Sequence, residues 1–141
     1  SVLDLYAGCG SISAFLADKY ENVVLVEHNR DALVFAEKNL SGKKHISYGL
    51  SGENWVKTCA SSLPPFDACV VDPPRSGMEK AVLDYLCKAK IKELCALSCD
   101  PATQARDCAA LVKAGYKIKE IYFLDFYPNT SHIESLVVFG I

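Results

Sequence analysis

Short apolar runs alternate with helix-like stretches along this chain, and this alternation constrains the fold more than any other feature. The runs that we expect to form strands lie at residues 2–6, 23–27, 68–72 and 94–98. They show little polar alternation, which is typical of a parallel sheet covered on both faces. The helix-like stretches lie at residues 12–19, 30–40, 78–89 and 101–114. The sequence therefore predicts an α/β fold with a doubly wound sheet.

The end of the chain departs from this alternation. A weak strand signal lies at 45–48, and two further strand signals close the chain at 119–126 and 134–140. The closing pair is joined by "YPNTSH" at 127–132, which leaves no room for a helix, so we expect an antiparallel pairing. A Rossmann-like, mostly parallel sheet with an antiparallel last strand resembles the plan of the class I methyltransferases.

Length and charge bound the possible functions. The chain has 141 residues, half of them hydrophobic, so we expect residues 1–141 to form a single domain with a proper core. Because the first residues already read as a strand, we expect this domain to belong to a longer protein. The net charge of -2 is not the basic charge expected of a nucleic-acid-binding protein, although a basic partner domain could supply phosphate contacts. No apolar run approaches the ~20 residues that cross a bilayer, so we expect no membrane association.

Cysteine usage indicates the compartment. The chain has seven cysteines, an odd number, and no C-x-x-C spacing. A disulfide framework and a zinc site therefore both fit poorly, and we expect no metal. Free thiols that serve as small core residues are typical of a reducing compartment, which predicts a cytoplasmic protein.

The stretch "DLYAGCGS" follows the first expected strand and has the composition of a nucleotide-binding turn. Gly8 and Gly10 form a G-x-G turn without a third glycine at the Rossmann spacing, and Glu27 follows seventeen residues after Gly10. An acid at the tip of the second strand can bind both ribose hydroxyls. Together with Asp4 in the first strand, this pattern favours S-adenosylmethionine, which needs no pyrophosphate cradle. A dinucleotide site or a plain turn is the alternative.

Two further strand ends carry candidate chemistry. In "VVDPPRSG", Asp72 follows the fourth strand, where ligands lie in doubly wound sheets, although it could merely form a turn or cap a helix. Arg75 could hold a phosphate or carboxylate, or be a solvated surface charge. In "ALSCDPATQARD", Cys99 follows a buried strand and precedes a helix start, and a helix amino end favours a thiolate. Buried filler is the usual role of cysteine, but this position favours a nucleophile.

The stretch "FYPNTSHIESLVVF" supplies another candidate. Glu134 begins an otherwise apolar strand directly after the segment that contains His132, and the intervening turn residues direct its side chain. In isolation, a glutamate at a strand start is more often solvated, and a lone histidine is more often structural.

Five stretches together carry a resemblance to a known family: "DLYAGCGSIS", "VEHNRDALVFAEKN", "VVDPPRSG", "LSCDPATQARD" and "DFYPNTSHIES". They resemble the catalytic domain of the RNA uracil-5-carbon methyltransferases, which make 5-methyluridine in transfer and ribosomal RNA. The last three are the specific ones, because amino-methylating relatives usually carry DPPY or NPPY in place of "DPPRSG". The resemblance implies that Cys99 is the nucleophile and Glu134 the general base.

The same resemblance implies the remaining site residues. The implied cofactor positions are Tyr6, Gly8, Gly10, Ser11, Glu27, Ser51 and Asp72. The implied substrate contacts are Asp72, Arg75 and His132. Two departures concern the cofactor contacts: Ser11 stands where asparagine is common, and Leu50 stands where the family usually has an acid.

The implied reaction is methylation of carbon 5 of a tRNA or rRNA uridine by S-adenosylmethionine, through a covalent cysteine–uracil intermediate. The uridine would be flipped or unpaired. The resemblance also implies an RNA-binding domain ahead of this chain, and we expect a monomer. An amino-group methyltransferase on the same fold is the nearest alternative, and it needs no cysteine. A non-catalytic cofactor- or RNA-binding module and an NAD-dependent oxidoreductase are the others, the last disfavoured by the missing third glycine.

Overall fold

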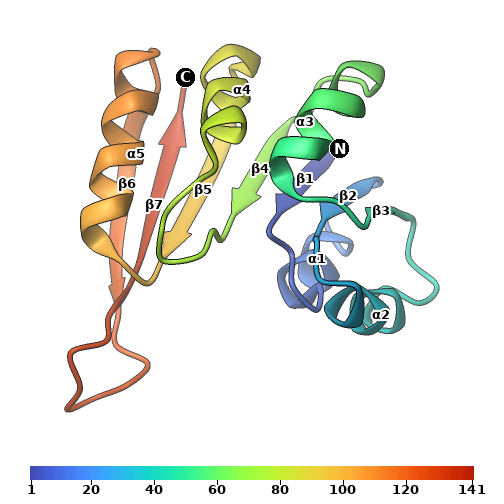
Figure 1. The fold of residues 1–141 in the computed structure, drawn as a ribbon, viewed down its shortest axis with the longest axis horizontal. Helices are drawn as coiled ribbons and strands as arrows, with labels where there is room; N and C mark the ends of the chain where they lie inside the picture. Colours follow the sequence, from blue (N-terminus) through green and yellow to red (C-terminus); the bar gives the residue numbers. More distant parts are fainter.

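The computed structural model describes residues 1–141 as one seven-stranded sheet with helices on both faces (Figure 1). The strand order is β3-β2-β1-β4-β5-β7-β6. The strands are β1 (Val2–Leu5), β2 (Val23–Val26), β3 (His45–Tyr48), β4 (Ala68–Val71), β5 (Glu93–Ser98), β6 (Lys117–Leu124) and β7 (Glu134–Gly140). Strands β1 to β5 are parallel, and β7 is antiparallel to both of its neighbours, β5 and β6. The predicted α/β sheet with an antiparallel last strand is confirmed.

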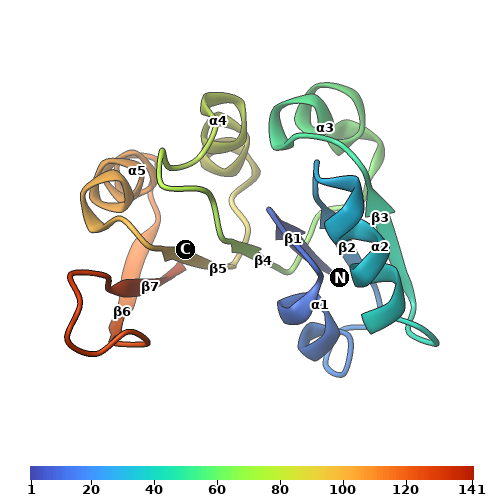
Figure 2. The same cartoon turned by 60° about the horizontal axis from the view of Figure 1, so that its bottom comes forward.

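The helices divide between the two faces of this sheet. They are α1 (Ser11–Leu16), α2 (Arg30–Asn39), α3 (Gly52–Thr58), the short 3-10 helix η1 (Ala60–Ser62), α4 (Lys80–Ala89) and α5 (Pro101–Lys113). Helices α3, α4 and α5 cover one face, and α1 and α2 cover the other beside β1, β2 and β3 (Figure 2). None of the helices is long and apolar enough to cross a bilayer.

The main core lies between the sheet and α3, α4 and α5. Alternate strand residues, such as Leu3 and Leu5 of β1, point to this side because side chains alternate along a strand. Trp55 of α3 is completely buried there and makes an edge contact with the Tyr85 ring at 5.6 Å between centroids. Burial of a large aromatic side chain stabilises the fold by about 2–3 kcal/mol, which holds α3 against the sheet.

Several element bounds differ from the sequence expectation. The sequence pattern does not predict helix α3, because Gly52, Asn54 and Thr58 are poor helix formers; burial of Trp55 overrides that local preference. The strand expected at 119–126 begins two residues earlier, since β6 pairs with β7 from Lys117 opposite Gly140. The second strand ends at Val26, so Glu27 lies just beyond it.

Candidate active site

A cavity of about 640 Å³ lies at the carboxyl ends of the parallel strands. Its walls come from the ends of β1 and β2, from the segment before α3, from the loop between β4 and α4, and from α4 and α5. They include Tyr6, Val26, Glu27, Leu50, Ser51, Met78, Glu79, Leu83, Arg106 and Asp107. Ligand sites in doubly wound sheets lie at this edge, and the volume suits a ligand of drug-like size.

The carboxylate of Glu27 is fixed at the wall of this cavity. The side chain is only 7% exposed. Its Oε2 accepts a hydrogen bond from the Gly8 amide at 2.9 Å, and its Oε1 accepts one from the Asn29 amide at 2.6 Å. The His28 Nδ1 atom also lies 3.2 Å from Oε1. Each carboxylate oxygen has two acceptor positions, so Oε2 keeps one for a ligand hydroxyl.

The glycines of the first turn have different roles. Gly8 has a φ of 55°, and a Cβ added there would meet nothing within 4 Å, so the backbone is open to a ligand. Gly10 has a φ of 71°, and a Cβ there would lie 2.9 Å from the Ala36 Cβ. Gly10 therefore permits the start of α1 to pack closely against Ala36 of α2, on the far side of the turn from the cavity.

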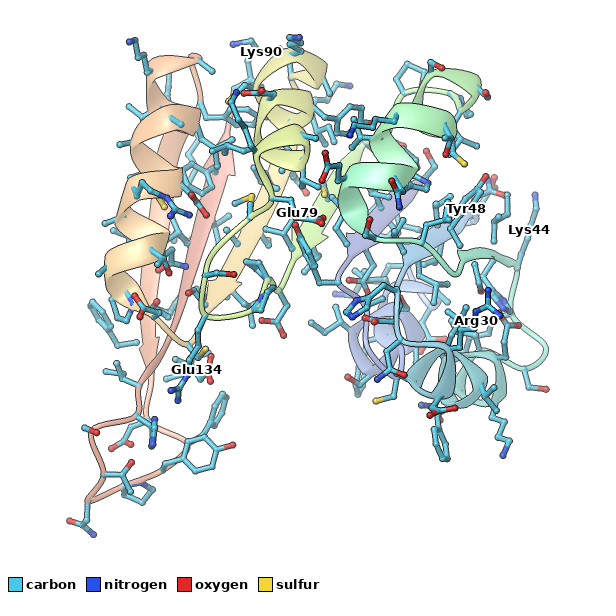
Figure 3. All side chains as sticks on the ribbon, in the orientation of Figure 1. Arg30, Lys44, Tyr48, Glu79, Lys90 and Glu134 are labelled. Atoms are coloured by element: carbon cyan, nitrogen blue, oxygen red, sulfur yellow. The ribbon has the colours of Figure 1, made fainter.

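Tyr6 joins two walls of the cavity. It is one of three non-glycine residues with positive φ, at 65°, a conformation that costs about 1–3 kcal/mol and is often found at functional sites. Its hydroxyl accepts a hydrogen bond from the Glu79 amide at 3.1 Å. Burial raises the pKa of the Tyr6 phenol, so it stays neutral. Figure 3 shows Glu79 just ahead of α4, where its carboxylate Oε2 also accepts from the Glu53 amide at 2.8 Å.

Asp4 lies below the glycine turn as a fully buried acid. Its Oδ2 accepts a hydrogen bond from the Ser13 hydroxyl at 2.6 Å, whereas its Oδ1 has no protein partner. Burial, followed by the charge of Asp72, raises the pKa of Asp4 to about 6, against the lowering effect of the Ser13 hydroxyl. Asp4 therefore titrates close to physiological pH.

Cys99 and Glu134 meet at the end of neighbouring strands. Ser98 of β5 is directly opposite Ser135 of β7, so Cys99 and Glu134 are the next residues toward the sheet edge on each strand. Both are half-buried. Ser98 and Ser135 point to the buried α5 side, so by alternation Glu134 points to the opposite side of the sheet, and Cys99 lies in the bend just beyond β5. Figure 3 shows Glu134 at the lower end of β7.

The turn that holds Cys99 is fixed by Ser98 and Asp100. The Ser98 hydroxyl accepts from the Asp100 amide and donates to the Asp100 carbonyl, both at 3.0 Å. The Asp100 carboxylate caps α5 by accepting from the Ala102 and Thr103 amides at 3.0 and 2.9 Å. The amino end of α5 is thus occupied by Asp100, and the amide donors expected to favour a Cys99 thiolate are already used.

Asp72 lies beside this pair rather than in the cavity wall. Partial burial, and then the negative charge of Glu134, raise the pKa of Asp72. At the rim, an Arg75 guanidinium nitrogen lies 3.2 Å from His132 Nδ1, and the Tyr127 ring makes an edge contact with the His132 ring. Arg75 and His132, predicted separately from the sequence, are therefore in contact.

The loop between β4 and α4 is anchored to α5. Asp107 is buried, and its Oδ2 accepts from the Met78 amide at 2.8 Å while its Oδ1 pairs with the Arg106 guanidinium at 2.8 Å. Gly77, with a φ of 83°, passes so close that an added Cβ would lie 2.7 Å from Asp107 Oδ2. The glycine that ends "DPPRSG" is therefore required because the loop packs closely against α5.

The predicted residues thus form two groups and leave three outside. Tyr6, Glu27 and Ser51 line the cavity. The second group comprises Cys99, Glu134, Asp72, Arg75 and His132. Gly8, Gly10 and Ser11 do not line the cavity. The Gly8 amide bonds Glu27, Gly10 contacts α2, and Ser11 is exposed at the start of α1.

Sequence reasoning does not assign Glu79, Arg106 or Asp107 to the site, although all three line the cavity. Their signal is weak because charged residues before a helix, like Glu79, or within one, like Arg106 and Asp107, are common on surfaces. Leu50 stands out in the sequence only as a departure from a family pattern, and it also lies in the cavity wall. No group of three or more His, Cys, Asp or Glu side chains is arranged to hold a metal ion.

Two family profiles match the chain. The profile described as tRNA (uracil-5-)-methyltransferase matches residues 62–140, and that of the methyltransferase small domain matches residues 1–93. An uncharacterized RNA methyltransferase of Treponema denticola is 42% identical over 99% of this chain, which spans 38% of that protein. One from Bacillus cereus is 38% identical over 98% of the chain and is covered over 31% of its length. The chain therefore spans about a third of the length of these relatives.

A solved structure has the same architecture. The Pyrococcus abyssi tRNA (uracil-54, C5)-methyltransferase, in complex with S-adenosyl-L-homocysteine, superposes with a TM-score of 0.84 at 31% identity. The match covers 98% of this chain and 33% of the archaeal one. A putative RNA methyltransferase of Pyrococcus horikoshii has a TM-score of 0.71 at 17% identity, which reflects the shared fold alone.

Proposed function

The chain belongs to the tRNA (uracil-5-)-methyltransferase family, and from this premise we propose that its protein methylates carbon 5 of a uridine in RNA. S-adenosyl-L-methionine is the proposed methyl donor. The observation that carries the proposal is the convergence of Cys99 and Glu134 at the end of β5 and β7, beside the cavity that contains Glu27.

The cavity residues fit the proposed cofactor. The Glu27 carboxylate offers an acceptor to the ribose hydroxyls through Oε2, and Val26, Leu50 and Leu83 offer apolar surface to an adenine ring. The open turn at Gly8 leaves room for the amino-acid end. Leu50 provides packing where an acid would provide a hydrogen bond. When bound, the cofactor supplies a methyl group on a sulfonium, which is a strong electrophile.

Carbon 5 of uracil is a weak nucleophile, so the proposed role of Cys99 is to activate it covalently. The thiolate adds to carbon 6, and the carbon 5–carbon 6 π electrons move onto the carbonyl oxygen as an enolate. Carbon 5 then takes the methyl group, whose bond to the sulfonium sulfur breaks as the new carbon–carbon bond forms. Glu134 removes the remaining carbon 5 proton, the double bond re-forms, and the Cys99 thiolate leaves. Carbons 5 and 6 are bonded neighbours, which requires Cys99 and Glu134 to be adjacent.

The rim supports an RNA substrate. A uridine must leave its stack to reach Cys99. Tyr127, His132 and Arg75 offer an aromatic ring, an imidazole and a guanidinium at the same rim, and unstacked bases bind such groups. With a net charge of -2, the chain provides few phosphate contacts, so we assign these to an RNA-binding domain elsewhere in the full-length protein.

The test uses the full-length protein with S-adenosylmethionine and transfer or ribosomal RNA that contains 5-fluorouridine. Fluorine cannot leave as a proton, so a covalent adduct should persist on a denaturing gel. Cys99→Ala should abolish both the adduct and methylation of normal RNA while cofactor binding persists. Cys87→Ala, a half-buried cysteine in α4 far from this edge, is the matched control and should behave as wild type.

Two results would contradict the proposal. Methylation by Cys99→Ala would remove Cys99 as the nucleophile. Methylation of a base nitrogen by the wild-type enzyme, without an adduct, would favour an amino-group methyltransferase on the same fold.

A further inference from the structure

Three buried polar side chains lie directly behind Cys99 and Glu134. Ser98 is 2% exposed, Gln104 7% and Ser135 1%. They come from β5, α5 and β7, and they meet in the layer between the sheet and α5. Burial of polar groups is unfavourable unless each is hydrogen-bonded, so their partners reveal what the group does.

Gln104 is the centre of this group. Its Nε2 donates to the Ala96 carbonyl of β5 at 2.8 Å and to the Ser135 carbonyl of β7 at 3.3 Å. Its Oε1 accepts from the Ser135 hydroxyl at 2.5 Å. One side chain on α5 therefore contacts the backbones of both strands that carry the proposed catalytic residues.

The serines extend these contacts to the two site residues. The Ser135 hydroxyl also lies 3.3 Å from the Ser98 carbonyl, across the ladder. The Ser98 hydroxyl in turn holds the Asp100 backbone on the far side of Cys99. Cys99 is thus fixed by hydrogen bonds on both flanks, and Glu134 directly precedes the fixed Ser135.

Among the buried residues of α5, Gln104 is the polar one that bonds β5 and β7, whereas Asp107 bonds the Met78 amide of the β4–α4 loop. Further along the same helix, Leu111 is buried without polar contacts and Cys108 faces the same core. An apolar residue would pack this interface without a requirement for partners. Ser98, Gln104 and Ser135 therefore lie next to the ends of β5 and β7 that carry Cys99 and Glu134, where the relative position of the two strands sets the geometry of the site.

We propose that Gln104 is a positioning residue that fixes the separation between the Cys99 sulfur and the Glu134 carboxylate. The inference rests on the proposed function, in which these groups act on adjacent carbons of one ring. Glu134 follows the exposed loop at 125–133, which does not fix its position. Without Gln104, the start of β7 would lose the hydrogen bonds that hold Ser135 to α5. A misplacement of about 1 Å at such a site can reduce the rate roughly a hundredfold.

The test is Gln104→Leu in the full-length enzyme, which keeps the side-chain size and removes all three hydrogen bonds. We expect kcat for RNA methylation to fall about tenfold to a hundredfold, with the Kd for S-adenosylmethionine and the KM for RNA changed less than about twofold. Ser135→Ala should reduce kcat similarly. The double variant should be no slower than the slower single variant, because both changes break one network.

Tyr116→Phe is the matched control. The Tyr116 hydroxyl is also buried near α5 and bonds the Ile91 amide and the Leu86 carbonyl, at the opposite end of the sheet. This variant should lose stability without losing kcat at temperatures where it is folded. An equal fall in kcat for Tyr116→Phe and Gln104→Leu at matched fractions folded would make Gln104 merely structural and overturn the proposal.

Other outcomes are equally decisive. Wild-type kcat in a folded Gln104→Leu variant would overturn the proposal, and if that variant does not fold, kcat of Ser135→Ala decides. Failure of the proposed function would appear elsewhere, as carbon 5 methylation absent from the wild type or retained by Cys99→Ala.

Discussion

Ser98 and Ser135 are directly opposite in the antiparallel ladder of β5 and β7, and the Ser135 hydroxyl lies 3.3 Å from the Ser98 carbonyl oxygen. This pairing brings Cys99 and Glu134 together, although they are far apart in the sequence. Opposite residues of an antiparallel pair have Cβ atoms about 5 Å apart. The ladder therefore fixes Ser98 against Ser135, and Cys99 and Glu134 each lie one residue beyond that pair.

Glu134→Gln should separate methyl transfer from product release. The amide cannot take the carbon 5 proton, so methylated RNA should stay covalently bound, and turnover should fall by about 10²- to 10⁴-fold. A denaturing gel with RNA labelled through the transferred methyl group measures the trapped species. Glu93→Gln, at the other end of β5, is the control and should turn over normally. Rapid turnover without a trapped species would show that another group removes the proton.

The parts of the fold that can be predicted from the sequence are those that depend on local pattern. The strand ends at Asp72 and Cys99 are located by a buried apolar run that stops at a turn residue, and the start of β7 at Glu134 matches the prediction. Parallel topology then brings such ends to one edge. Helix α3 escapes prediction because its stability comes from burial of Trp55 rather than from helix propensity.

The Gln104 network could not be predicted for a topological reason. Gln104 and Ser135 are 31 residues apart, and they meet only because β7 inserts between β5 and β6. Sequence order alone would place β6 beside β5. The cavity wall could also be predicted only in part. Asp107 of α5 lines the cavity because it packs against the β4–α4 loop and accepts a hydrogen bond from the Met78 amide, a contact that the sequence does not reveal.

Glu27→Gln should weaken cofactor binding. The side chain keeps its shape, but its new NH₂ group must face either the Gly8 amide or the Asn29 amide, both of which are donors. One hydrogen bond to a charged acceptor contributes about 1.5–3 kcal/mol, so the Kd for S-adenosylmethionine should rise roughly tenfold to a hundredfold by calorimetry. The exposed Glu53→Gln is the control. An unchanged Kd would exclude Glu27 from the cofactor site.

Gly77→Ala should destabilise the protein through a clash at the base of the cavity. The residue has a φ of 83°, and the added Cβ would overlap the Arg106 guanidinium and lie 2.7 Å from Asp107 Oδ2. Gly42→Ala is the matched control, because Gly42 has a φ of 77° but open space around it. Both variants bear the backbone strain, of about 1 kcal/mol, and only Gly77→Ala adds the clash. Equal free energies of unfolding for the two variants, measured in urea, would show that the loop moves away without cost.

Asp4→Asn should remove a pH dependence of stability. The pKa of Asp4 is raised from 3.8 to about 6 in the folded protein, so between those values the folded state binds more protons than the unfolded state. The contribution of Asp4 to stability therefore falls as pH rises from about 4 to about 6 and stays low above that range. A shift of this size corresponds to roughly 3 kcal/mol.

The side-chain amide of the introduced asparagine keeps an oxygen acceptor for the Ser13 hydroxyl without a buried charge. The free energy of unfolding of Asp4→Asn minus that of the wild type, from urea denaturation, should accordingly increase between about pH 4.5 and pH 7.5. The difference cancels the titrating groups that do not interact with Asp4. The repulsion between Asp4 and Asp72 is removed by the same substitution and adds to the increase. A difference that does not change with pH would mean that Asp4 has the same pKa in the folded and unfolded states, and that its unpaired Oδ1 is solvated.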